Sequence, residues 1–265
     1  LVRLHQLLPR YEVDRTEKKF KEAFKAEFGL AIDVLFDIQG RSIDYANKVG
    51  NPIVVISKES FEEKILAECL DAEYFRLFYE NFVLSKEAYN EMPVSEKLLQ
   101  RYNRSVQLSS RPWVLYEDKI LYTTKSIYVS CQVLLERVDA GTVKHTSRLM
   151  RNYIGKISEK KGHLFTQNLG KYFKSLEEED IIVNMEVQIC PGKPLCAEEN
   201  LGDIDVLLID SKRKKIVCIE AKDYYCARTI YDMISQNIKI EKALPKVIRR
   251  DEWCREHRAL FKFYS

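Results

Sequence analysis

Two apolar segments joined by a charged turn decide the fold of the second half of this chain: Gly202-Asp203-Ile204-Asp205-Val206-Leu207-Leu208-Ile209 and Ile216-Val217-Cys218-Ile219-Glu220-Ala221-Lys222. Each segment is short and rich in aliphatic residues, as buried strands are, and the residues between them are polar and typical of a turn. We therefore predict an antiparallel hairpin that pairs Ile209 with Ile216.

The register of this hairpin brings charged side chains together. Continuing it along both strands places Asp205 opposite Glu220, and cross-strand partners share a face with Cβ atoms about 4.5–5.5 Å apart. The two-residue period of a strand puts Lys222 on that face too. Two neighbouring carboxylates repel unless a cation lies between them, and Mg²⁺ or Mn²⁺ takes such oxygen ligands. The sequence therefore predicts a metal site at Asp205 and Glu220, with Lys222 beside a phosphate or an attacking water.

The pattern of these residues resembles the PD-(D/E)xK superfamily, the restriction-endonuclease-like fold of Mg²⁺-dependent nucleases. Gly202-Asp203-Ile204-Asp205 and Glu220-Ala221-Lys222 match its Gly-x-x-Asp and Glu-x-Lys elements, and the resemblance covers residues 160–258. It implies that Asp205, Glu220 and Lys222 are catalytic. It also implies that Asp205, Glu220 and the backbone carbonyl of Ala221 ligate the metal, with Asp203 as a further candidate ligand and 5′-phosphates on the products.

Three departures from the superfamily pattern stand out. Members often carry an acidic residue after Gly-x-x-Phe on the preceding helix, but Thr166 follows Gly162-His163-Leu164-Phe165 here, so that ligand is missing or comes from Glu159 or Asp203. A Gln after Glu-x-Lys has only Gln236 as a counterpart, and His163 is a second accessory candidate. The fold also expects one more strand, for which only residues 259–264 are available.

The rest of the chain fits an α/β fold class: a restriction-endonuclease-like mixed β-sheet flanked by helices, preceded by a mostly helical α+β N-terminal domain. We predict an N-terminal domain at residues 1–143, for interaction or substrate positioning, and the nuclease-like domain at 144–265. The elements expected are a helix after Thr16 that carries Phe20, Phe24 and Phe28 and ends at Gly29, strands at 53–56 and 181–189, a hairpin at 116–122, and helices after Gly162 and over about 228–258, the last broken or kinked at Pro245.

Net charge names no partner, because 43 basic residues stand against 40 acidic ones. Local charge is more informative, since a basic run precedes the predicted site. Its members are Lys144, Arg148, Arg151, Lys156, Lys160 and Lys161. Such side chains can contact the phosphates of nucleic acid, although a solvated helix face is the alternative. The late helix adds a second, less favoured basic region from Lys239 to Arg258.

The seven cysteines do not indicate a disulfide framework in a chain of this size and ordinary composition. We expect reduced thiols and a cytoplasmic protein. A zinc site at Cys190, Cys196, Cys254 and His257 is a weaker alternative, because the spacing is not that of zinc modules. No apolar run reaches the length of a membrane span. Since the chain begins at Leu1, we expect a fragment or a processed product, which leaves room for an upstream domain that the sequence does not describe.

Three hypotheses for function follow. The first is a metal-dependent endo- or exonuclease that hydrolyses phosphodiester bonds in DNA. The second is a catalytically inactive relative that binds nucleic acid or a protein partner, which the missing helix acid favours. The third is a ribonuclease, because nothing in the sequence separates the two polymers. The sequence contains no phosphate-binding Gly-x4-Gly-Lys-Ser/Thr loop, and it does not indicate the oligomeric state.

Overall fold

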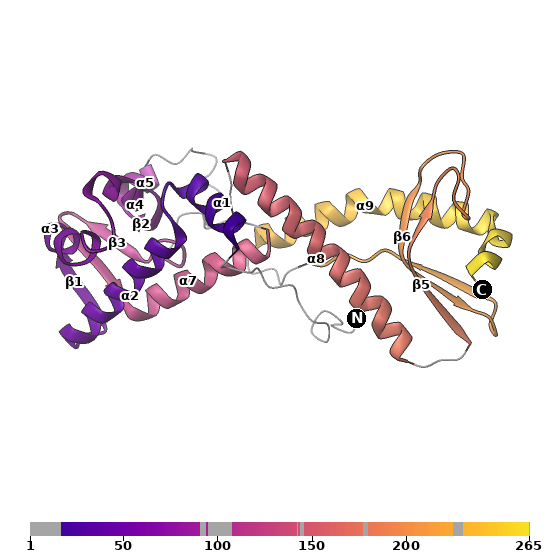
Figure 1. The fold of residues 1–265 in the computed structure, drawn as a ribbon, viewed down its shortest axis with the longest axis horizontal. Coiled ribbons are helices and arrows are strands. Elements are labelled where there is room, and N and C mark those ends of the chain that lie inside the picture. The colour runs from indigo at the N-terminus through magenta and orange to yellow at the C-terminus, as the bar shows by residue number, and fades with distance from the viewer. Residues whose placement is uncertain are drawn as a thin grey trace. The chain divides into compact units, whose positions relative to one another are not determined.

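The computed structural model describes residues 17–90, 94, 108–141, 143, 146–176, 180–224 and 230–264. These residues form two compact units, an N-terminal unit up to Ser158 and a C-terminal unit from Glu159 (Figure 1). The division falls inside helix α8 (Arg148–Ser175), and the domain boundary after residue 143 stays a prediction. Among the described helices, none combines the length and the apolarity that crossing a bilayer needs.

The N-terminal unit is mostly helical and carries a four-stranded mixed sheet in the order β1-β4-β3-β2. Strand β2 runs parallel to β3, and the other pairs are antiparallel. Its elements are α1 (Lys18–Phe28), α2 (Ile32–Val49), β1 (Ile53–Ser57), α3 (Lys58–Phe61), the π-helical turn η2 (Glu62–Leu66), the 3-10 turn η3 (Ala72–Tyr74), α4 (Phe75–Phe82), β2 (Val83–Leu84), α5 (Lys86–Asn90), β3 (Trp113–Tyr116), β4 (Lys119–Thr123) and α7 (Thr124–Asp139). The predicted α+β character is confirmed.

Helix α1 shows how the sequence pattern builds this unit. Phe20 and Phe24, one turn apart, are fully buried, and Gly29 ends the helix with a left-handed φ of 72°. Both features agree with the predicted helix, although Thr16, its predicted cap, lies outside the described residues. The buried aromatic rings continue into Phe78, Phe82 and Trp113, so the core joins α1 and α4 to the sheet.

The start of α8 is fixed by a carboxylate from α1. Glu27 accepts hydrogen bonds from the backbone N–H groups of Thr146 (2.7 Å) and Ser147 (2.8 Å), and Ser147 Oγ accepts from Met150 N–H. Partial burial acts to raise the pKa of Glu27, but these hydrogen bonds outweigh it and lower the pKa below its usual value. Glu27 and Ser147 together therefore provide acceptors for three backbone N–H groups at and just before the start of this helix.

The C-terminal unit has a three-stranded sheet in the order β5-β6-β7. Its elements are α8 from Glu159 onward, β5 (Ile181–Ile189), β6 (Gly202–Asp210), β7 (Lys215–Ile219), α9 (Ile230–Glu256) and the 3-10 helix η4 (Arg258–Tyr264). Ile209 pairs with Ile216, so the predicted hairpin register is confirmed. The predicted strand at 181–189 is also present, with the same bounds.

Four expectations about this unit need correction. Its described strands all pair antiparallel, not as a mixed sheet. Residues 259–264, the only candidate for a further strand, form η4, which buries Phe261 in the core against the sheet. Helix α8 does not begin after Gly162 but runs through it from Arg148, because buried residues on both sides hold the helix in place. Helix α9 likewise continues through Pro245 without a break.

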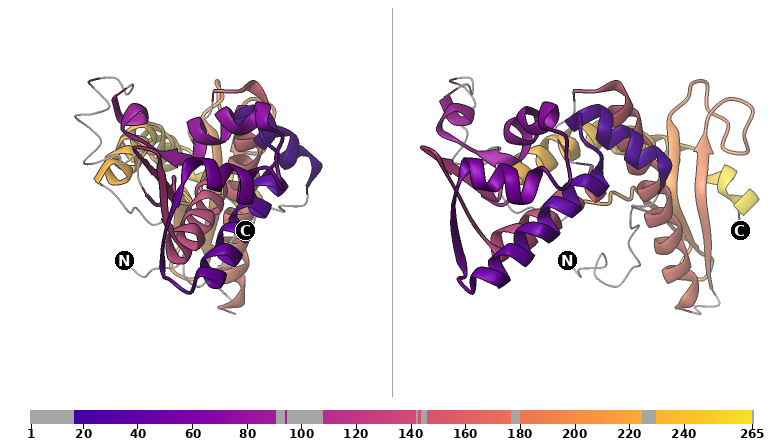
Figure 2. Two further views of the ribbon diagram at one scale, coloured as in Figure 1. Left: turned by 90° about the vertical axis from the view of Figure 1, so that its left-hand side faces the viewer. Right: turned by 60° about the vertical axis from the view of Figure 1, so that its left-hand side comes forward.

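The sheet of the C-terminal unit lies between α8 and η4 (Figures 1 and 2). On the α8 side, Gly170 approaches β5 so closely that a Cβ atom there would lie 2.1 Å from Met185 Sδ. On the other side, Cys254 of α9 and Phe261 belong to the same core cluster as the β6 residues Ile204, Leu207 and Ile209. This packing fixes α9 against the end of the hairpin at which the predicted site residues lie.

Candidate active site

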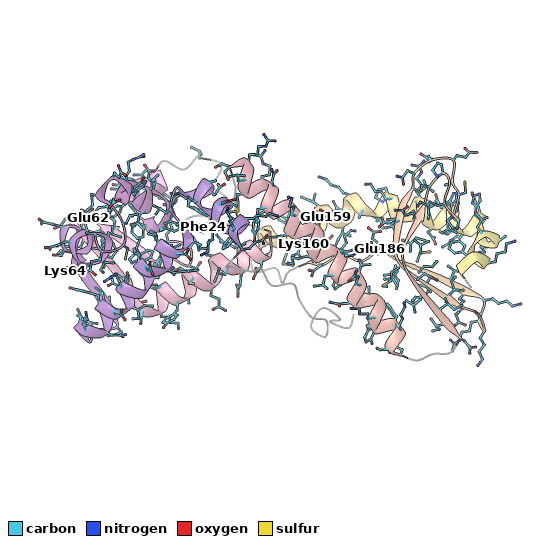
Figure 3. The ribbon with its side chains drawn as sticks, viewed as in Figure 1. Phe24, Glu62, Lys64, Glu159, Lys160 and Glu186 are labelled. Atoms are coloured by element: carbon cyan, nitrogen blue, oxygen red, sulfur yellow. The ribbon has the colours of Figure 1, made fainter. Side chains whose placement is uncertain are left out.

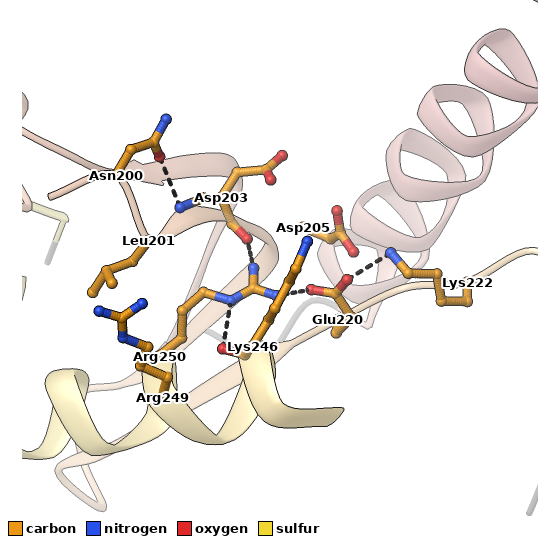
Figure 4. A pocket seen from close by; sticks show the side chains of 10 residues that line it. Asn200, Leu201, Asp203, Asp205, Glu220, Lys222, Lys246, Arg249 and Arg250 are labelled. Atoms are coloured by element: carbon orange, nitrogen blue, oxygen red, sulfur yellow. Dashed lines mark hydrogen bonds and ion pairs between the residues drawn. The ribbon is translucent and has the colours of Figure 1, made fainter. Parts of the chain in front are cut away.

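A pocket of about 420 Å³ lies in the C-terminal unit at the open end of the β6–β7 hairpin, away from its turn (Figure 4). It contains the four side chains that the sequence singled out and three basic side chains from α9. The lining residues are Asn200, Leu201, Gly202, Asp203, Asp205, Glu220, Lys222, Lys246, Arg249 and Arg250. Three carboxylates and four cationic groups thus share one hollow.

Asp205 and Glu220 reach the pocket just beyond the paired part of the hairpin. The ladder between β6 and β7 ends with Val206 opposite Ile219, so Asp205 and Glu220 are the next residues along each chain. Instead of a backbone pair, the N–H of Ala221 donates to Asp205 Oδ2 at 2.5 Å. Lys222 Nζ lies 2.5 Å from Glu220 Oε1. The structure therefore brings together the three side chains predicted to act together.

Sequence reasoning missed the three α9 members of this site, and Arg250 is the buried one among them. Its side chain is 10% exposed, and its Nη2 lies 2.5 Å from Glu220 Oε2. Nη1 donates to the backbone carbonyl of Asp203, at the start of β6. The sequence contained one indication that Arg250 is buried. Arg250 follows Val247 by three residues and precedes Cys254 by four, so the three side chains share one face of the helix, and the other two are also shielded from solvent. Arg250 thus ties α9 to both strands of the hairpin.

The surroundings of Asp205 and Glu220 shift the pKa values of the two carboxyl groups in opposite directions. Burial raises the pKa of Asp205, and the nearby charges of Glu220 and Asp203 raise it further against the hydrogen bond from Ala221 and the charge of Lys222. Burial also acts to raise the pKa of Glu220, but Lys222 and Arg250 outweigh it and lower the pKa. Within the described residues, no ion pair includes Asp205. Asp205 is therefore the carboxylate that lacks a direct cationic partner.

The donors in the pocket fit Mg²⁺ or Mn²⁺ in kind. Carboxylate and carbonyl oxygens are the ligands that these hard cations take, and one or two carboxylates suffice when water or phosphate completes the shell. A cation beside Asp205 would offset the burial and the like charges that raise its pKa. The described residues contain no group of three or more His, Cys, Asp or Glu close enough to hold an ion. Ligation would thus depend on Asp205, Glu220 and the carbonyl of Ala221.

The accessory residues near the hairpin have partners elsewhere. Lys161 of α8 lies 3.9 Å from Asp223, next to Lys222 in the chain. His163 pairs with Glu186 of β5, which has a left-handed φ of 55°, and contacts Gln167. Gln236 lies on α9 but does not line the pocket. His163 and Gln236 therefore do not lie in the pocket. Lys161 lies beside the segment after β7 that carries Lys222.

The predicted basic run is divided between the two units. Arg148, Arg151 and Lys156 are exposed on the part of α8 that belongs to the N-terminal unit. Glu159 and Lys160 are exposed on the part that belongs to the C-terminal unit (Figure 3). Thr166, at the position where the superfamily often has an acid, is buried. Lys144 lies outside the described residues.

The residues of the zinc alternative lie in different surroundings. Cys254 is buried in the core and contacts Cys218. His257 stacks on Trp253, and Cys196 is exposed. Since the described residues contain no cluster of three or more suitable ligands, the four residues of the alternative are not gathered into one site.

No protein-family model matches the chain, and comparison with curated proteins and with solved structures finds no significant match. The residues of the pocket therefore have to carry any functional assignment. What they offer is an acid pair, a lysine and a buried arginine at the end of one hairpin.

Proposed function

We propose that this protein is a metal-dependent phosphodiester hydrolase of the PD-(D/E)xK type that acts on DNA. The observation that carries the proposal is the convergence of Asp205, Glu220 and Lys222 in one pocket beside three further cationic groups from α9. Resemblance of the Gly-x-x-Asp and Glu-x-Lys elements to that superfamily adds support. The N-terminal unit is proposed to position the substrate or to bind a partner.

Each side chain has a defined part in the proposed reaction. Asp205, Glu220 and the Ala221 carbonyl would hold Mg²⁺ or Mn²⁺, which when bound polarises a phosphate and makes a water molecule more acidic. Lys222 is 46% exposed in its side chain and engages Glu220 at Nζ. An ammonium group has three N–H donors, so Lys222 can also orient the attacking water or contact a phosphate oxygen. Arg250 holds Glu220 and the start of β6 in place.

The α9 side of the pocket supports a polyanionic substrate. Lys246 and Arg249 line the pocket and are exposed, and Arg249 also pairs with the exposed Glu199. Exposed cations of this kind contact backbone phosphates without reading bases. Lys160 and Lys161 on α8 are further candidates in the same unit. DNA is proposed as the substrate, and RNA is the other polymer that the same contacts would accept.

A second candidate function is nucleic-acid or protein binding without catalysis. One observation favours it: both oxygens of Glu220 already have a cationic partner, Lys222 on one side and Arg250 on the other. The buried Thr166 in place of a helix acid points the same way. In that case the four cations of the pocket would bind a phosphate and no hydrolysis would follow.

Plasmid nicking in Mg²⁺ or Mn²⁺ tests the first proposal, with a labelled RNA in parallel. We expect wild-type protein to nick the plasmid, and Asp205→Ala and Lys222→Ala to lower the rate by at least about 100-fold. Asp210→Asn is the matched control, because Asp210 ends β6 outside the pocket and pairs with Arg213. Equal rates in all variants would contradict the site. Retained binding of DNA with no cleavage by wild-type protein would favour the second candidate.

A further inference from the structure

A pair of thiols lies next to the candidate site and takes no part in it. Cys218 is on β7 and Cys254 is on α9, and their Sγ atoms are 3.9 Å apart. Cys254 is 6% exposed and belongs to the core cluster of the C-terminal unit, while Cys218 is partly buried against that cluster. A disulfide has an S–S length of about 2.05 Å, so a small rotation of the two side chains would bring the sulfurs to bonding distance.

The Cys218–Cys254 thiol pair and the Glu220–Arg250 ion pair both join the β7 segment to α9. We call this line of two contacts the seam. Glu220 follows Cys218 by two residues, which is about 6.6 Å along a strand. Arg250 precedes Cys254 by four residues, which is about 6 Å along a helix. The two contacts thus repeat at the same spacing on both elements. Any link between Cys218 and Cys254 would hold Arg250 beside Glu220.

We propose that Cys218 and Cys254 form a reversible disulfide that fastens α9 to the hairpin and fixes the seam beside the pocket. Reduced thiols are the resting state of the pair, and the disulfide is its oxidised form. This inference is independent of the proposed hydrolase activity, because it rests on the placement of the two sulfur atoms. It assigns the pair a redox role and not a metal-binding one, since the described residues add no third ligand to it.

The chemistry needs an oxidant, for which a low-molecular-weight disulfide suffices. The sulfur of Cys218, on the outer strand of the described sheet, attacks one sulfur of the oxidant RSSR. The S–S bond of RSSR breaks, one RSH leaves with a proton, and a mixed disulfide forms at Cys218. Cys254 then attacks Cys218 Sγ and releases the second RSH. Two thiols lose two electrons and two protons, and RSSR gains them.

The test treats the reduced 265-residue chain with oxidised glutathione under native conditions. We expect thiol titration of the unfolded product to find two fewer than the seven cysteines of the reduced chain. Intact mass should fall by two hydrogens, and peptide mapping should show a peptide that joins Cys218 to Cys254. The midpoint of thermal unfolding should rise by about 5 °C or more and return on reduction, because the link closes a long loop.

Two variants make the outcome decisive. Cys254→Ser should leave Cys218 with a glutathione adduct and no loss of two hydrogens, whereas the control Cys190→Ser should form the same link as wild-type protein. Glutathione adducts on both residues of the wild-type chain, a different pairing, or a link that forms only in denaturant would overturn the proposal. If Cys254→Ser does not fold, mapping of the wild-type chain decides the question alone.

Discussion

Arg250 of α9 and Glu220, the residue after β7, form an ion pair with 2.5 Å between Nη2 and Oε2 in a largely buried setting. The same guanidinium donates to the carbonyl of Asp203 and, at 3.4 Å, to the carbonyl of Lys246. A buried carboxylate that keeps its charge needs such partners, because desolvation otherwise favours the neutral form. Arg250 therefore ties the catalytic candidate Glu220 to the fold of the unit.

Replacing Arg250 tests this link. We expect Arg250→Ala to lower the free energy of unfolding by about 2–3 kcal/mol, below the full cost of breaking a buried pair because Glu220 keeps Lys222. Arg249→Ala is the control, since Arg249 is 60% exposed and pairs with an exposed Glu199, and it should change stability by less than about 0.5 kcal/mol. Urea unfolding measures both. Equal losses in the two variants would mean that the Arg250–Glu220 pair adds no stability.

The Glu27 contact with the start of α8 predicts a pH-dependent contribution to stability. Its folded-state pKa is lowered, so its contribution is present above the unfolded pKa and is lost as pH falls through the folded value. At pH 7 we expect Glu27→Gln to lower the free energy of unfolding by about 1 kcal/mol, since the site is partly exposed and screened. Urea unfolding from pH 7 to pH 3 should show the difference from wild type shrinking. Glu22→Gln, on the same helix with only a 3.8 Å pair to Lys18, should show no such trend.

Two glycines of α8 should respond to alanine with opposite signs. A Cβ at Gly170 would lie 2.1 Å from Met185 Sδ and 2.7 Å from Met185 Cγ, so Gly170→Ala should destabilise by about 1–3 kcal/mol. A Cβ at Gly162 meets nothing within 4 Å, so Gly162→Ala should stabilise by about 0.5–1 kcal/mol through helix propensity. Thermal or urea unfolding of the two variants shows whether each change raises or lowers the stability of the protein. Stabilisation by both variants would show that α8 does not pack on β5 as described.

The hairpin could be predicted from sequence because its information is local. Ile209 and Ile216 end two apolar runs across a polar turn, and side-chain alternation then fixes which residues share a face. The same alternation placed Asp205 near Glu220 without knowledge of the rest of the chain. Helix α1 was predictable for a similar reason, since its buried residues Phe20 and Phe24 repeat at the helical period.

The parts of the fold and of the site that the sequence did not predict depend on contacts between residues far apart in the chain. Arg250 lies 30 residues from Glu220 in the chain. Its helical spacing from Val247 and Cys254 can indicate burial, but nothing in the local sequence identifies Glu220 as its partner. Helix α8 passes through Gly162 because tertiary packing overrides the low helix propensity of glycine. Residues 259–264 likewise form a 3-10 helix, in which Phe261 is buried in the core cluster of the unit, although the aromatic pattern also suits a strand.

Asp205 offers a test of the metal site that does not depend on catalysis. Its folded-state pKa is raised by burial and by neighbouring carboxylates, so in metal-free buffer the free energy of unfolding should rise as pH falls through the range in which Asp205 takes up a proton. Asp205→Asn removes the charge but keeps an oxygen that can accept from Ala221 N–H. In EDTA at pH 7 it should stabilise by about 0.5–2 kcal/mol, the range that single stabilising substitutions commonly give.

Divalent metal should make wild-type protein more stable than Asp205→Asn, the reverse of the order expected in EDTA. A cation that binds only the folded state raises the unfolding temperature in proportion to the logarithm of its concentration, so Mg²⁺ or Mn²⁺ should stabilise wild-type protein and leave Asp205→Asn unchanged. Asp210→Asn should respond to metal as wild type does, because Asp210 lies outside the pocket. Thermal unfolding with and without metal gives both results. An equal response of wild type and Asp205→Asn would exclude Asp205 as a ligand, whereas no response in either would favour the second candidate, a site that binds phosphate through its four cations without metal.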